Sequence, residues 1–587
     1  MDKSLLGKYW QQRVVDEDLV NGITRGLGVS DFLARLLSVR VSSPQQAMDF
    51  LDPKIRRLLP DPFHLLDMDK AISRVIKAIR KKEKICIFAD YDVDGATSSS
   101  LIKNVFRQLG IEISIYVPDR IAEGYGPTPE SMTRIYQSGA SLLITVDCGS
   151  MAFEALEIAA SLRLEVIVID HHISADTLPK AVAVINPNRL DETSEHKNLA
   201  AVGVSFLFCV ALIAELKKIN FFEQNSISVP NLIEQLDIVA LGTVCDVMTL
   251  TGLNRGFVSQ GLKISRQRNN IGLTALSDLA GLDGAINCYH LGFILGPRIN
   301  AGGRVGKADL GANLLSSVCR NQASVIAEEL CKYNEERKAI ELVMLEEAYD
   351  IASTQADQPI LFIVGEDWHP GVIGIIAGRL KEQYNKPVAV IALQNGIGRA
   401  SCRSVRGIDF GTKIMEAKNL GLLVAGGGHQ MAAGFTVMAE KLSALREYLN
   451  QAFATDLLLS DAHTQEYYDS ELTLDAANLT ILTEIDRLEP YGNGNPPPVF
   501  KFEGVYVLKA DIISGRHLRV LFAPARDSYS SKALPAIAFN SAGTELARVI
   551  MSPKPLKLSI FGSLKLNKWQ DKNNVQLQLK DVMVEAC

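Results

Sequence analysis

Three short apolar runs that end in acidic or imidazole side chains stand out in the hydropathy pattern. They read I-C-I-F-A-D-Y-D-V-D-G at 85–95, L-L-I-T-V-D-C-G at 142–149 and V-I-V-I-D-H-H at 166–172. Four or five apolar residues follow one another in each run without alternation, which is typical of a parallel strand buried on both faces. Amphipathic helical segments alternate with these runs. We therefore predict an α/β fold built on a doubly wound parallel sheet.

The pattern changes along the chain and predicts five parts. Residues 322–352 carry apolar side chains at helical spacing and predict one helix of about 45 Å, long enough to connect two domains. E-P-Y-G-N-G-N-P-P-P at 489–498 is typical of a linker, and the short strand-like runs after it indicate a small β-barrel. The expected parts are a helical lead-in (1–70), an α/β core (71–320), a connecting helix (321–354), a second, smaller α/β domain (355–458), and a linker with the barrel (459–587).

Composition and charge limit the class of protein. The 587 residues carry a net charge of −6, so a nucleic-acid partner would have to be held by a local basic groove. The nine cysteines form no C-x-x-C pair, as expected of reduced thiols in the cytoplasm. Residues 199–216 imitate a membrane span but contain Ser205 and Glu215, so we expect a buried helix. The N-terminus has no signal-peptide pattern. We expect a soluble, cytoplasmic protein without a membrane partner.

The polar residues that follow the three apolar runs predict a metal site. The carboxyl ends of parallel strands meet at one edge of the sheet, where open α/β folds bind their ligands. So many carboxylates repel one another in a partly dry site, and bound divalent cations are the simplest remedy. The residues expected to converge there are Asp90, Asp92, Asp94, Asp147, Asp170, His171 and His172.

The details of this site follow from the local sequence. If the chain is still extended through D-Y-D-V-D, alternate acids share a face, and Gly95 lets the backbone turn into a helix that begins near Ala96. Imidazole ligands suit Mn²⁺ as well as Mg²⁺, and two such ions would support an in-line phosphoryl displacement. Asp246 ends another apolar segment, where it is either a further ligand or an ordinary turn residue.

Two glycine-rich segments with polar side chains indicate a second cluster. G-I-G-R-A-S-C-R-S-V-R (396–406) and G-G-G-H-Q-M-A-A-G (426–434) combine exposed amides with arginine side chains, which fit the oxygens of a phosphate. Glycine-rich turns also commonly serve only to turn the chain. P-R-I-N-A-G-G-R (297–304) likewise either contributes to an anion site or only turns the chain. His369 is either a structural or a functional residue.

These motifs together resemble a known family. D-Y-D-V-D-G, V-D-C-G and D-H-H, with L-G-T-V-C-D downstream, resemble the DHH phosphoesterase superfamily, and G-G-G-H-Q-M-A-A-G resembles its associated domain. The order of the parts, the long helix, E-P-Y-G-N-G-N-P-P-P and the barrel tail resemble the bacterial RecJ family of single-strand-specific 5′→3′ DNA exonucleases. The resemblance covers the chain from about residue 40 onward. It implies that the barrel is an OB-fold, a common platform for single strands.

The resemblance implies an activity and a set of site residues. The activity is hydrolysis of phosphodiester bonds with two Mn²⁺ or Mg²⁺ ions, which releases 5′-mononucleotides in DNA repair and recombination. Many superfamily members have a histidine where this chain has Phe88, and Asp90 is the candidate to replace it. The implied metal ligands are Asp92, Asp94, Asp147, His171 and Asp246, with Asp90 and His172 as catalytic positions beside the ions. The implied substrate-binding residues are Arg298, Asn300, Arg304, Ser401, Arg403, Gly427, Gly428 and His429.

Two other functions compete with this interpretation. A phosphatase of short oligonucleotides or nucleotides shares the same core, although such substrates need no barrel. An inactive DHH-fold scaffold of the replication machinery would have lost motif acids, whereas every carboxylate of the core motif is present here. The expected partners of an exonuclease are single-stranded DNA, a single-strand-binding protein and a RecQ-type helicase. Nothing in the sequence requires more than a monomer.

Overall fold

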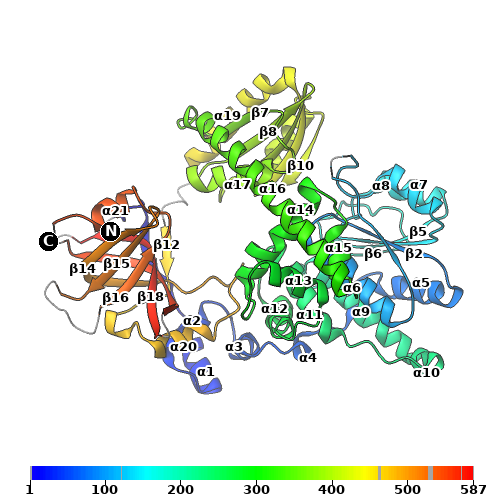
Figure 1. Ribbon diagram of the computed structural model, residues 1–587, viewed down its shortest axis with the longest axis horizontal. Helices are drawn as coiled ribbons and strands as arrows, with labels where there is room; N and C mark the ends of the chain where they lie inside the picture. Colours follow the sequence, from blue (N-terminus) through cyan, green and yellow to red (C-terminus); the bar gives the residue numbers. More distant parts are fainter. Residues whose placement is uncertain are drawn as a thin grey trace. The chain divides into compact units, whose positions relative to one another are not determined.

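The chain forms two compact units in the computed structural model shown in Figure 1, which describes residues 3–120, 122–459, 465–525, 533–554, 556–569 and 572–585. One unit is Lys54–Ser460. The other combines the two ends of the chain, Met1–Pro53 and Asp461–Cys587. The first 70 residues are therefore divided at Pro53, and the domain limits expected from the sequence otherwise stay predictions.

A five-stranded parallel sheet is the centre of the unit Lys54–Ser460, in the order β3-β2-β4-β5-β6. From β2 the chain moves to β3 on one side, then returns to β4 on the other, so the sheet has its topological switch point between β2 and β4. This confirms the predicted doubly wound sheet. The strands are β2 (Ile85–Ala89), β3 (Ser114–Tyr116), β4 (Leu142–Val146), β5 (Glu165–Ile169) and β6 (Ala183–Ile185).

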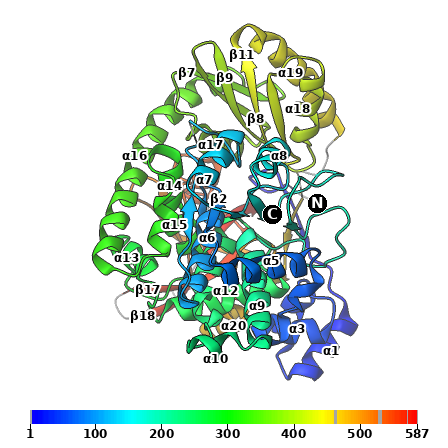
Figure 2. The same cartoon turned by 90° about the vertical axis from the view of Figure 1, so that its right-hand side faces the viewer.

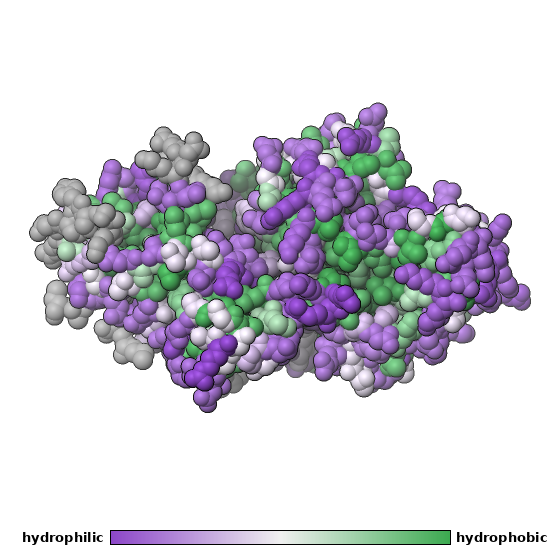
Figure 3. All heavy atoms as spheres, turned by 90° about the horizontal axis from the view of Figure 1, so that it is seen from below, coloured by the Kyte–Doolittle hydropathy of each residue, from purple (hydrophilic) through white to green (hydrophobic). Residues whose placement is uncertain are grey.

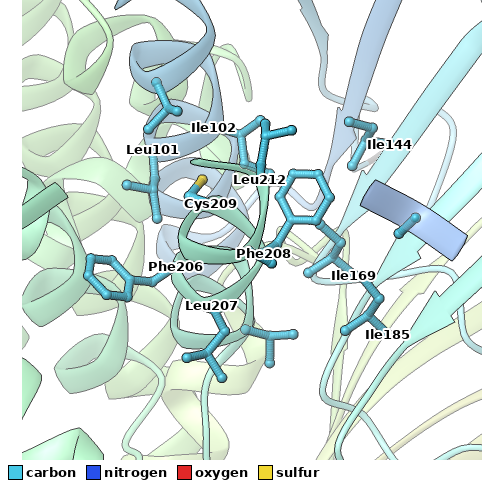
Figure 4. Packing of buried hydrophobic residues seen from close by; sticks show 14 of the residues in the cluster. Leu101, Ile102, Ile144, Ile169, Ile185, Phe206, Leu207, Phe208, Cys209 and Leu212 are labelled. Atoms are coloured by element: carbon cyan, nitrogen blue, oxygen red, sulfur yellow. The ribbon is translucent and has the colours of Figure 1, made fainter. Parts of the chain in front are cut away.

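Both faces of this sheet are covered by helices, which explains the unbroken apolar runs. Ile85 and Ile87 belong to the core on one face, with α5, α6 and α9, whereas Cys86 and Phe88 belong to the core on the other, with α7 and α8. Figure 4 shows Phe208 of α9 beside Ile169 of the sheet. These helices are α5 (Met68–Lys81), α6 (Val93–Gln108), α7 (Pro129–Gln137), α8 (Phe153–Ser161) and α9 (Ala201–Lys218).

Helix α9 contains most of the segment that imitates a membrane span. Its side chains are largely buried, as predicted. Among the described residues, no helix combines the length and apolar character needed to cross a membrane.

A layer of further helices lies beyond the parallel sheet, and these helices enclose a separate cluster of buried apolar side chains. Its last helix, α16, has 34 residues and is about 50 Å long at 1.5 Å per residue. Figure 2 shows α16 running from these helices to a second sheet, as expected of a connecting helix. The helices are α11 (Leu236–Cys245), α12 (Gly252–Ser265), α13 (Ile271–Leu279), the π-helix η3 (His290–Leu295), α14 (Gly296–Val305), α15 (Leu310–Leu315) and α16 (Arg320–Ser353).

The second sheet has the order β10-β11-β9-β8-β7 and is mixed, because only β7 and β8 are parallel. Its strands are β7 (Leu361–Glu366), β8 (Val388–Gln394), β9 (Ile397–Arg403), β10 (Ala425–His429) and β11 (Ala432–Met438). Its helices are α17 (Ile373–Tyr384), α18 (Phe410–Asn419) and α19 (Leu442–Leu459). Shorter elements of the same unit are α4 (Ile55–Leu58), η1 (Pro62–His64), α10 (Phe221–Asn225) and η2 (Leu232–Gln235).

The other unit is a closed barrel with helices around it. The pairing β14-β15-β16-β18-β17 returns to β14, which removes the free edges of the sheet and confirms the predicted β-barrel. Its elements are β12 (Gln465–Tyr468), β13 (Ser470–Glu471), α20 (Leu479–Asp486), β14 (Phe500–Ile513), β15 (His517–Ala523), β16 (Leu534–Ala538), α21 (Glu545–Ile550), β17 (Leu558–Trp569) and β18 (Lys572–Val584).

The N-terminal segment belongs to the barrel unit. Strand β1 (Tyr9–Gln12) pairs in parallel with β12, and the apolar faces of three helices join the barrel core. Asp16 caps the first helix at its start, and Gly28 ends it in the left-handed conformation that glycine adopts without strain. The helices are α1 (Glu17–Leu27), α2 (Asp31–Ser38) and α3 (Pro44–Leu51).

On the face drawn in Figure 3, polar side chains cover most of the surface, with apolar patches between them.

Candidate metal centre

The first motif, D-Y-D-V-D-G, forms the junction between β2 and α6. Asp92 is the N-cap of α6, and its Oδ1 accepts the backbone N–H groups of Asp94 (2.8 Å) and Gly95 (3.2 Å). The helix therefore begins at Val93, not near Ala96. The expectation that the three acids alternate along extended chain is wrong, because capping turns the chain at Asp92.

Gly95 is needed for a different reason than expected. It lies within the first turn of α6 and has no positive φ, so it makes no special turn. A Cβ at this position would overlap the backbone carbonyl oxygen of Asp90 and lie 2.8 Å from its nitrogen. The glycine thus lets the helix start directly against the end of β2.

The second motif places Asp147 after β4, on the other side of the switch point. Asp147 has a φ of 61°, a left-handed conformation that is uncommon outside glycine, and its side chain is buried. Gly149 follows with a φ of 115°, and a Cβ there would lie 2.6 Å from the hydroxyl of Thr145. This tight turn aims the carboxylate of Asp147 at the edge of the sheet.

The third motif is organised by Asp170, which follows β5. Its Oδ1 accepts the backbone N–H of His171 at 2.7 Å and lies 2.8 Å from the ring Nδ1 of His172. Its Oδ2 accepts the backbone N–H of Ser150 at 3.0 Å. The buried carboxylate of Asp170 therefore positions both imidazoles. The sequence predicts Asp170 at this edge of the sheet but gives it no role among the metal, catalytic or substrate-binding residues.

Two further acids come from the helices beneath this edge. The carboxylate of Asp94 accepts the N–H groups of Ala201 (2.6 Å) and Val202 (2.9 Å) at the start of α9. Asp246 follows α11 as its C-cap. Its Oδ2 lies 3.5 Å from Nε2 of His171, so Asp246 faces the site and is more than a turn residue.

The acids and imidazoles gather into three overlapping sets whose ligand atoms lie within 4.8 Å of one another. The buried atoms Asp90 Oδ1, His171 Nε2 and Asp246 Oδ2 have no hydrogen-bond partner among the described residues. Such unsatisfied polar atoms are costly unless something binds them, and carboxylate oxygens with imidazole nitrogen are the donors that Mn²⁺ and Mg²⁺ accept. The residues present thus fit divalent cations. The sets are Asp90, Asp92 and Asp147; Asp94, His171 and Asp246; and Asp147, His171 and His172.

The pKa values show how strongly the cluster needs positive charge. Burial, followed by repulsion from Asp92, raises the pKa of Asp94 to about 7, and burial with the charges of Asp94 and Asp92 raises that of Asp246 to about 9. Burial lowers the pKa of His171 to about 4, which leaves the neutral imidazole that a metal ion requires. Burial is the largest single influence on His172 and acts to lower its pKa, but the hydrogen bond to Asp170 together with the charges of Asp170, Asp246 and Asp90 raises this pKa to about 9.

Arginine side chains lie near the acids. The Nη1 of Arg304 donates to the carbonyl of Gly371 (2.9 Å), which connects α14 to the start of the second domain. Burial lowers the pKa of Arg304 to about 10, and the charges of Arg120 and Arg403 act in the same direction. Arg120, stacked over the ring of Tyr91 at 4.9 Å, was missed by sequence reasoning. Its position just after β3, at the ligand-binding edge of the sheet, could have identified it.

Ser401 and Arg403 lie at the end of β9, against the first turn of α17. Nη1 of Arg403 donates to the carbonyl of Cys402 (2.8 Å) and lies 3.4 Å from the hydroxyl of Ser401. The expected cradle of exposed amides is wrong for residues 397–403, because β9 pairs with β8 on one side and β11 on the other. In this segment, side chains are left to bind an anion.

A pocket of about 360 Å³ lies beside the acids and is lined by residues from both domains of this unit. His429 contributes from β10, and Gly427 and Gly428 precede it in the same strand. A Cβ at Gly427 would meet nothing within 4 Å, whereas at Gly428 it would overlap the backbone of Ala433. The lining residues are Tyr125, Gly126, Pro127, Gly149, Met151, Ala152, Asp170, His172, Ile173 and His429.

The two remaining predicted residues lie on α14. Nη1 of Arg298 donates to the carbonyl of Ile294 at 2.6 Å, so part of its guanidinium is engaged within its own helix. Asn300 is half-buried, two residues further along the helix.

Three segments of the chain match known domain families. Residues 84–243 match the DHH family N-terminal domain, residues 357–455 the DHHA1 domain, and residues 468–581 the RecJ OB domain. The single-stranded-DNA-specific exonuclease RecJ of Bacillus subtilis is 33% identical over 98% of this chain and 71% of its own length. That of Escherichia coli is 35% identical over 86% of this chain and 89% of its own.

A solved structure extends this similarity to the whole fold. RecJ from Thermus thermophilus in complex with Mn²⁺ superimposes with a TM-score of 0.81, at 26% identity, over 98% of this chain and 80% of that one. The same protein in complex with Mg²⁺ gives a TM-score of 0.76. With its DHH core, its associated domain and its OB barrel, the chain belongs to the RecJ family of the DHH phosphoesterases.

Proposed function

We propose that the chain is a metal-dependent exonuclease that hydrolyses single-stranded DNA from its 5′ end and releases 5′-mononucleotides. One observation carries the proposal: carboxylates and an imidazole with buried, unsatisfied ligand atoms lie near half-buried arginines. The acids suit cations, and the arginines suit the phosphates of a nucleic acid. The RecJ relatives carry the name of single-stranded-DNA-specific exonucleases. The 5′ polarity rests on the family resemblance alone.

Two Mn²⁺ or Mg²⁺ ions are the proposed cofactors. Asp92, Asp94, Asp147, His171 and Asp246 would hold them, and all five belong to the three ligand sets, which also contain Asp90 and His172. When bound, such an ion pair supplies an activated water and stabilises the attacking and leaving oxygens of an in-line displacement. In the same proposal, Asp90 and His172 act beside the ions.

The chain's own residues would hold the substrate against this centre. The hydrogen-bond partners of Arg304 and Arg403 are backbone carbonyls and the Ser401 hydroxyl. These partners are uncharged, so they do not neutralise the positive charges of the two arginines. We propose that Arg120, Arg304, Ser401 and Arg403 bind phosphate oxygens by charge-assisted hydrogen bonds. His429, exposed at the pocket shared with His172, would contact the same end of the strand. Arg298, Asn300, Gly427 and Gly428 complete the proposed substrate-binding set.

Cellular partners are also part of the proposal. An enzyme that consumes single strands needs another protein to make them accessible, and a single-strand-binding protein and a RecQ-type helicase are candidates. We propose that the protein acts as a monomer in DNA repair and recombination. The eight described cysteines are free thiols, which supports a reducing, cytoplasmic location.

Digestion of end-labelled oligonucleotides tests this function. We expect wild-type protein with Mn²⁺ to release a labelled mononucleotide early from a 5′-labelled single strand and late from a 3′-labelled one. Asp92→Asn should abolish release while keeping the helix cap, since asparagine caps helices as well as aspartate does. Asp16→Asn, at the N-cap of α1, is the matched control and should leave the rate unchanged.

The same assay separates the competing functions. Cleavage of dinucleotides without degradation of long strands would replace the proposal by a phosphatase of short oligonucleotides. Absence of release with any divalent cation would favour an inactive scaffold.

A further inference from the structure

Residues 288–305 form one continuous helix that contains a wide turn. The π-helix η3 passes directly into α14, and the N–H of Gly296 donates to the carbonyl of Leu291, five residues back. Pro297 explains the wide turn, because its ring lacks an N–H and would clash with a carbonyl in a regular α-helix. Arg298 satisfies the carbonyl of Ile294 with its side chain. Single π turns inside α-helices occur frequently at functional sites.

Two aromatic rings project from this wide turn into solvent. Tyr289 and Phe293 are stacked, with ring centroids 5.3 Å apart and an angle of 22° between the planes. They are 61% and 73% exposed, and Phe293 is the most exposed of the large aromatic side chains in the described part of the chain. Single exposed apolar residues are ordinary, but a stacked, solvent-facing pair keeps a large π surface available. We call this pair the aromatic platform.

Packing contacts connect the aromatic platform to the metal centre. The sulfur of Cys245 lies 3.4 Å from the carbonyl of Leu291, within η3. A Cβ on Gly296 would lie 2.5 Å from the same sulfur. Because Cys245 precedes Asp246, the wide turn is held against the end of α11 that supplies a candidate metal ligand.

The same helix leads from the platform to the arginines. Positions 289, 293, 297, 300 and 304 are spaced by three or four residues and so follow one side of the helix. Arg304, at the end of this stripe, contacts the second domain beside the metal centre. Eleven residues separate Phe293 from Arg304, about 16 Å along a helix. At about 3.4 Å per stacked nucleotide, this length corresponds to roughly five nucleotides.

We propose that the aromatic platform stacks against the bases of the single strand, about five nucleotides from the end held at the metal centre. This inference rests on the proposed function. Every base has a π face, so stacking would retain the strand without reading its sequence. The rings offer no charge for phosphates, which the arginines at the other end of the stripe would bind. A strand bound at both places would remain held while its terminal nucleotide is removed.

Substrate length makes the proposal testable. We would measure kcat and KM with Mn²⁺ for a trinucleotide, which is too short to reach the platform, and for a twelve-nucleotide single strand. Tyr289→Ala with Phe293→Ala should raise KM for the longer strand about tenfold, since one stacked base contributes about this much. KM for the trinucleotide and both kcat values should stay at the wild-type level. Phe293→Trp with Tyr289 intact should retain the low KM, because indole also stacks.

Two controls keep the outcomes distinct. Val325→Ala removes an apolar side chain of similar exposure (63%) from α16 and should change neither KM. A twelve-nucleotide strand that is abasic at its fourth to seventh positions should bind wild type and double variant equally. If the double variant matches Val325→Ala on the intact strand, the platform does not bind DNA and its rings serve another partner, such as a protein. If wild type cleaves neither substrate, the proposed function itself fails.

Discussion

Oδ1 of Asp170 lies 2.8 Å from the ring Nδ1 of His172, and the same carboxylate accepts the backbone N–H groups of Ser150, just after the second motif, and of His171 in its own motif. Both of its oxygens accept hydrogen bonds from N–H groups. Asp170 thus connects the loops after β4 and β5, although it is not itself in any of the three ligand sets. It is a positioning residue for the metal centre.

Asp170→Asn is expected to weaken metal binding by about 10- to 100-fold, as is usual when a partner of a ligand is lost. Asparagine offers one acceptor oxygen, so its NH₂ group would face an N–H donor of Ser150 or His171. The measurement is the Mn²⁺ concentration that gives half-maximal nuclease activity. Asp191→Asn, at an exposed acid paired with Arg189, serves as the control and should behave as wild type. Unchanged Mn²⁺ dependence of the Asp170 variant would exclude the positioning role.

Gly95→Ala should destroy the metal centre and destabilise the unit Lys54–Ser460. Its Cβ would overlap the carbonyl of Asp90, and the backbone at the end of β2 would have to move. Overpacking of this kind costs about 1–3 kcal/mol, and more where backbone blocks relief. Thermal unfolding and binding of Mn²⁺ by calorimetry would measure both effects.

Gly378→Ala provides the matched control for the Gly95 variant. Gly378 also lies in a helix, but a Cβ there would meet nothing within 4 Å. Because alanine favours helix more than glycine does, this variant should gain about 0.5–1 kcal/mol. Equal effects of the two substitutions would contradict the steric explanation.

Val247→Asn should stabilise the protein by about 1 kcal/mol, because the left-handed conformation costs L-residues about 1–2 kcal/mol. Val247 has a φ of 57°, which is unusual for a β-branched residue, and its side chain is 65% exposed. Asparagine adopts this conformation more readily, and little apolar burial is lost. The midpoint of urea unfolding would report the gain. Val325→Asn, equally exposed but in the interior of α16, should give none.

Asp237→Asn is expected to change the pH dependence of stability. Burial raises the pKa of Asp237 from 3.8 to about 7. Between these values the folded chain binds more protons than the unfolded chain, so the free energy of unfolding falls as pH rises and stays low above pH 7. The loss is about 1.4 kcal/mol for each unit by which the pKa is raised. Asparagine cannot ionise and avoids this loss.

Urea unfolding of the Asp237 variant at two pH values would test this. The variant should be more stable than wild type at pH 8, and the difference should shrink towards pH 4. Asp278→Asn, at an exposed acid of α13, should show no such trend. A difference that is independent of pH would mean that the pKa of Asp237 is the same in the folded and unfolded chains, which would contradict the effect of burial.

The fold could be predicted where one physical rule decides the pattern. Strands β2, β4 and β5 are buried on both faces, so their apolar runs were visible in the sequence, and parallel pairing brought their polar ends together. The long helix α16 was equally visible, since its apolar residues repeat at helical spacing over 34 residues. These features depend on local sequence.

Other features depend on neighbours that are distant in sequence. Asp92 and Asp94 belong to different ligand sets because a helix cap intervenes, and Asp94 is held by the start of α9, more than 100 residues away. The glycine-rich segment at 396–406 allowed two interpretations, a cradle of exposed amides or simple turns, and pairing with β8 and β11 occupies the backbone of residues 397–403. Arg120 carries no motif of its own. Only the assembled fold brings it near Arg304.

The parallel pairing of β1 with β12 has a consequence for how the protein is made. Residues 1–53 leave the ribosome before the strands and barrel core that they join, which are synthesised only after about 400 intervening residues. At roughly 5–20 residues per second, this delay is on the order of 20–80 s. During that time Ile23, Leu33 and Leu37, which are fully buried in the finished protein, have no barrel to cover them. The newly synthesised N-terminal helices therefore expose apolar side chains that chaperones can bind. The sheet and the metal centre, in contrast, can fold while the barrel is still being translated.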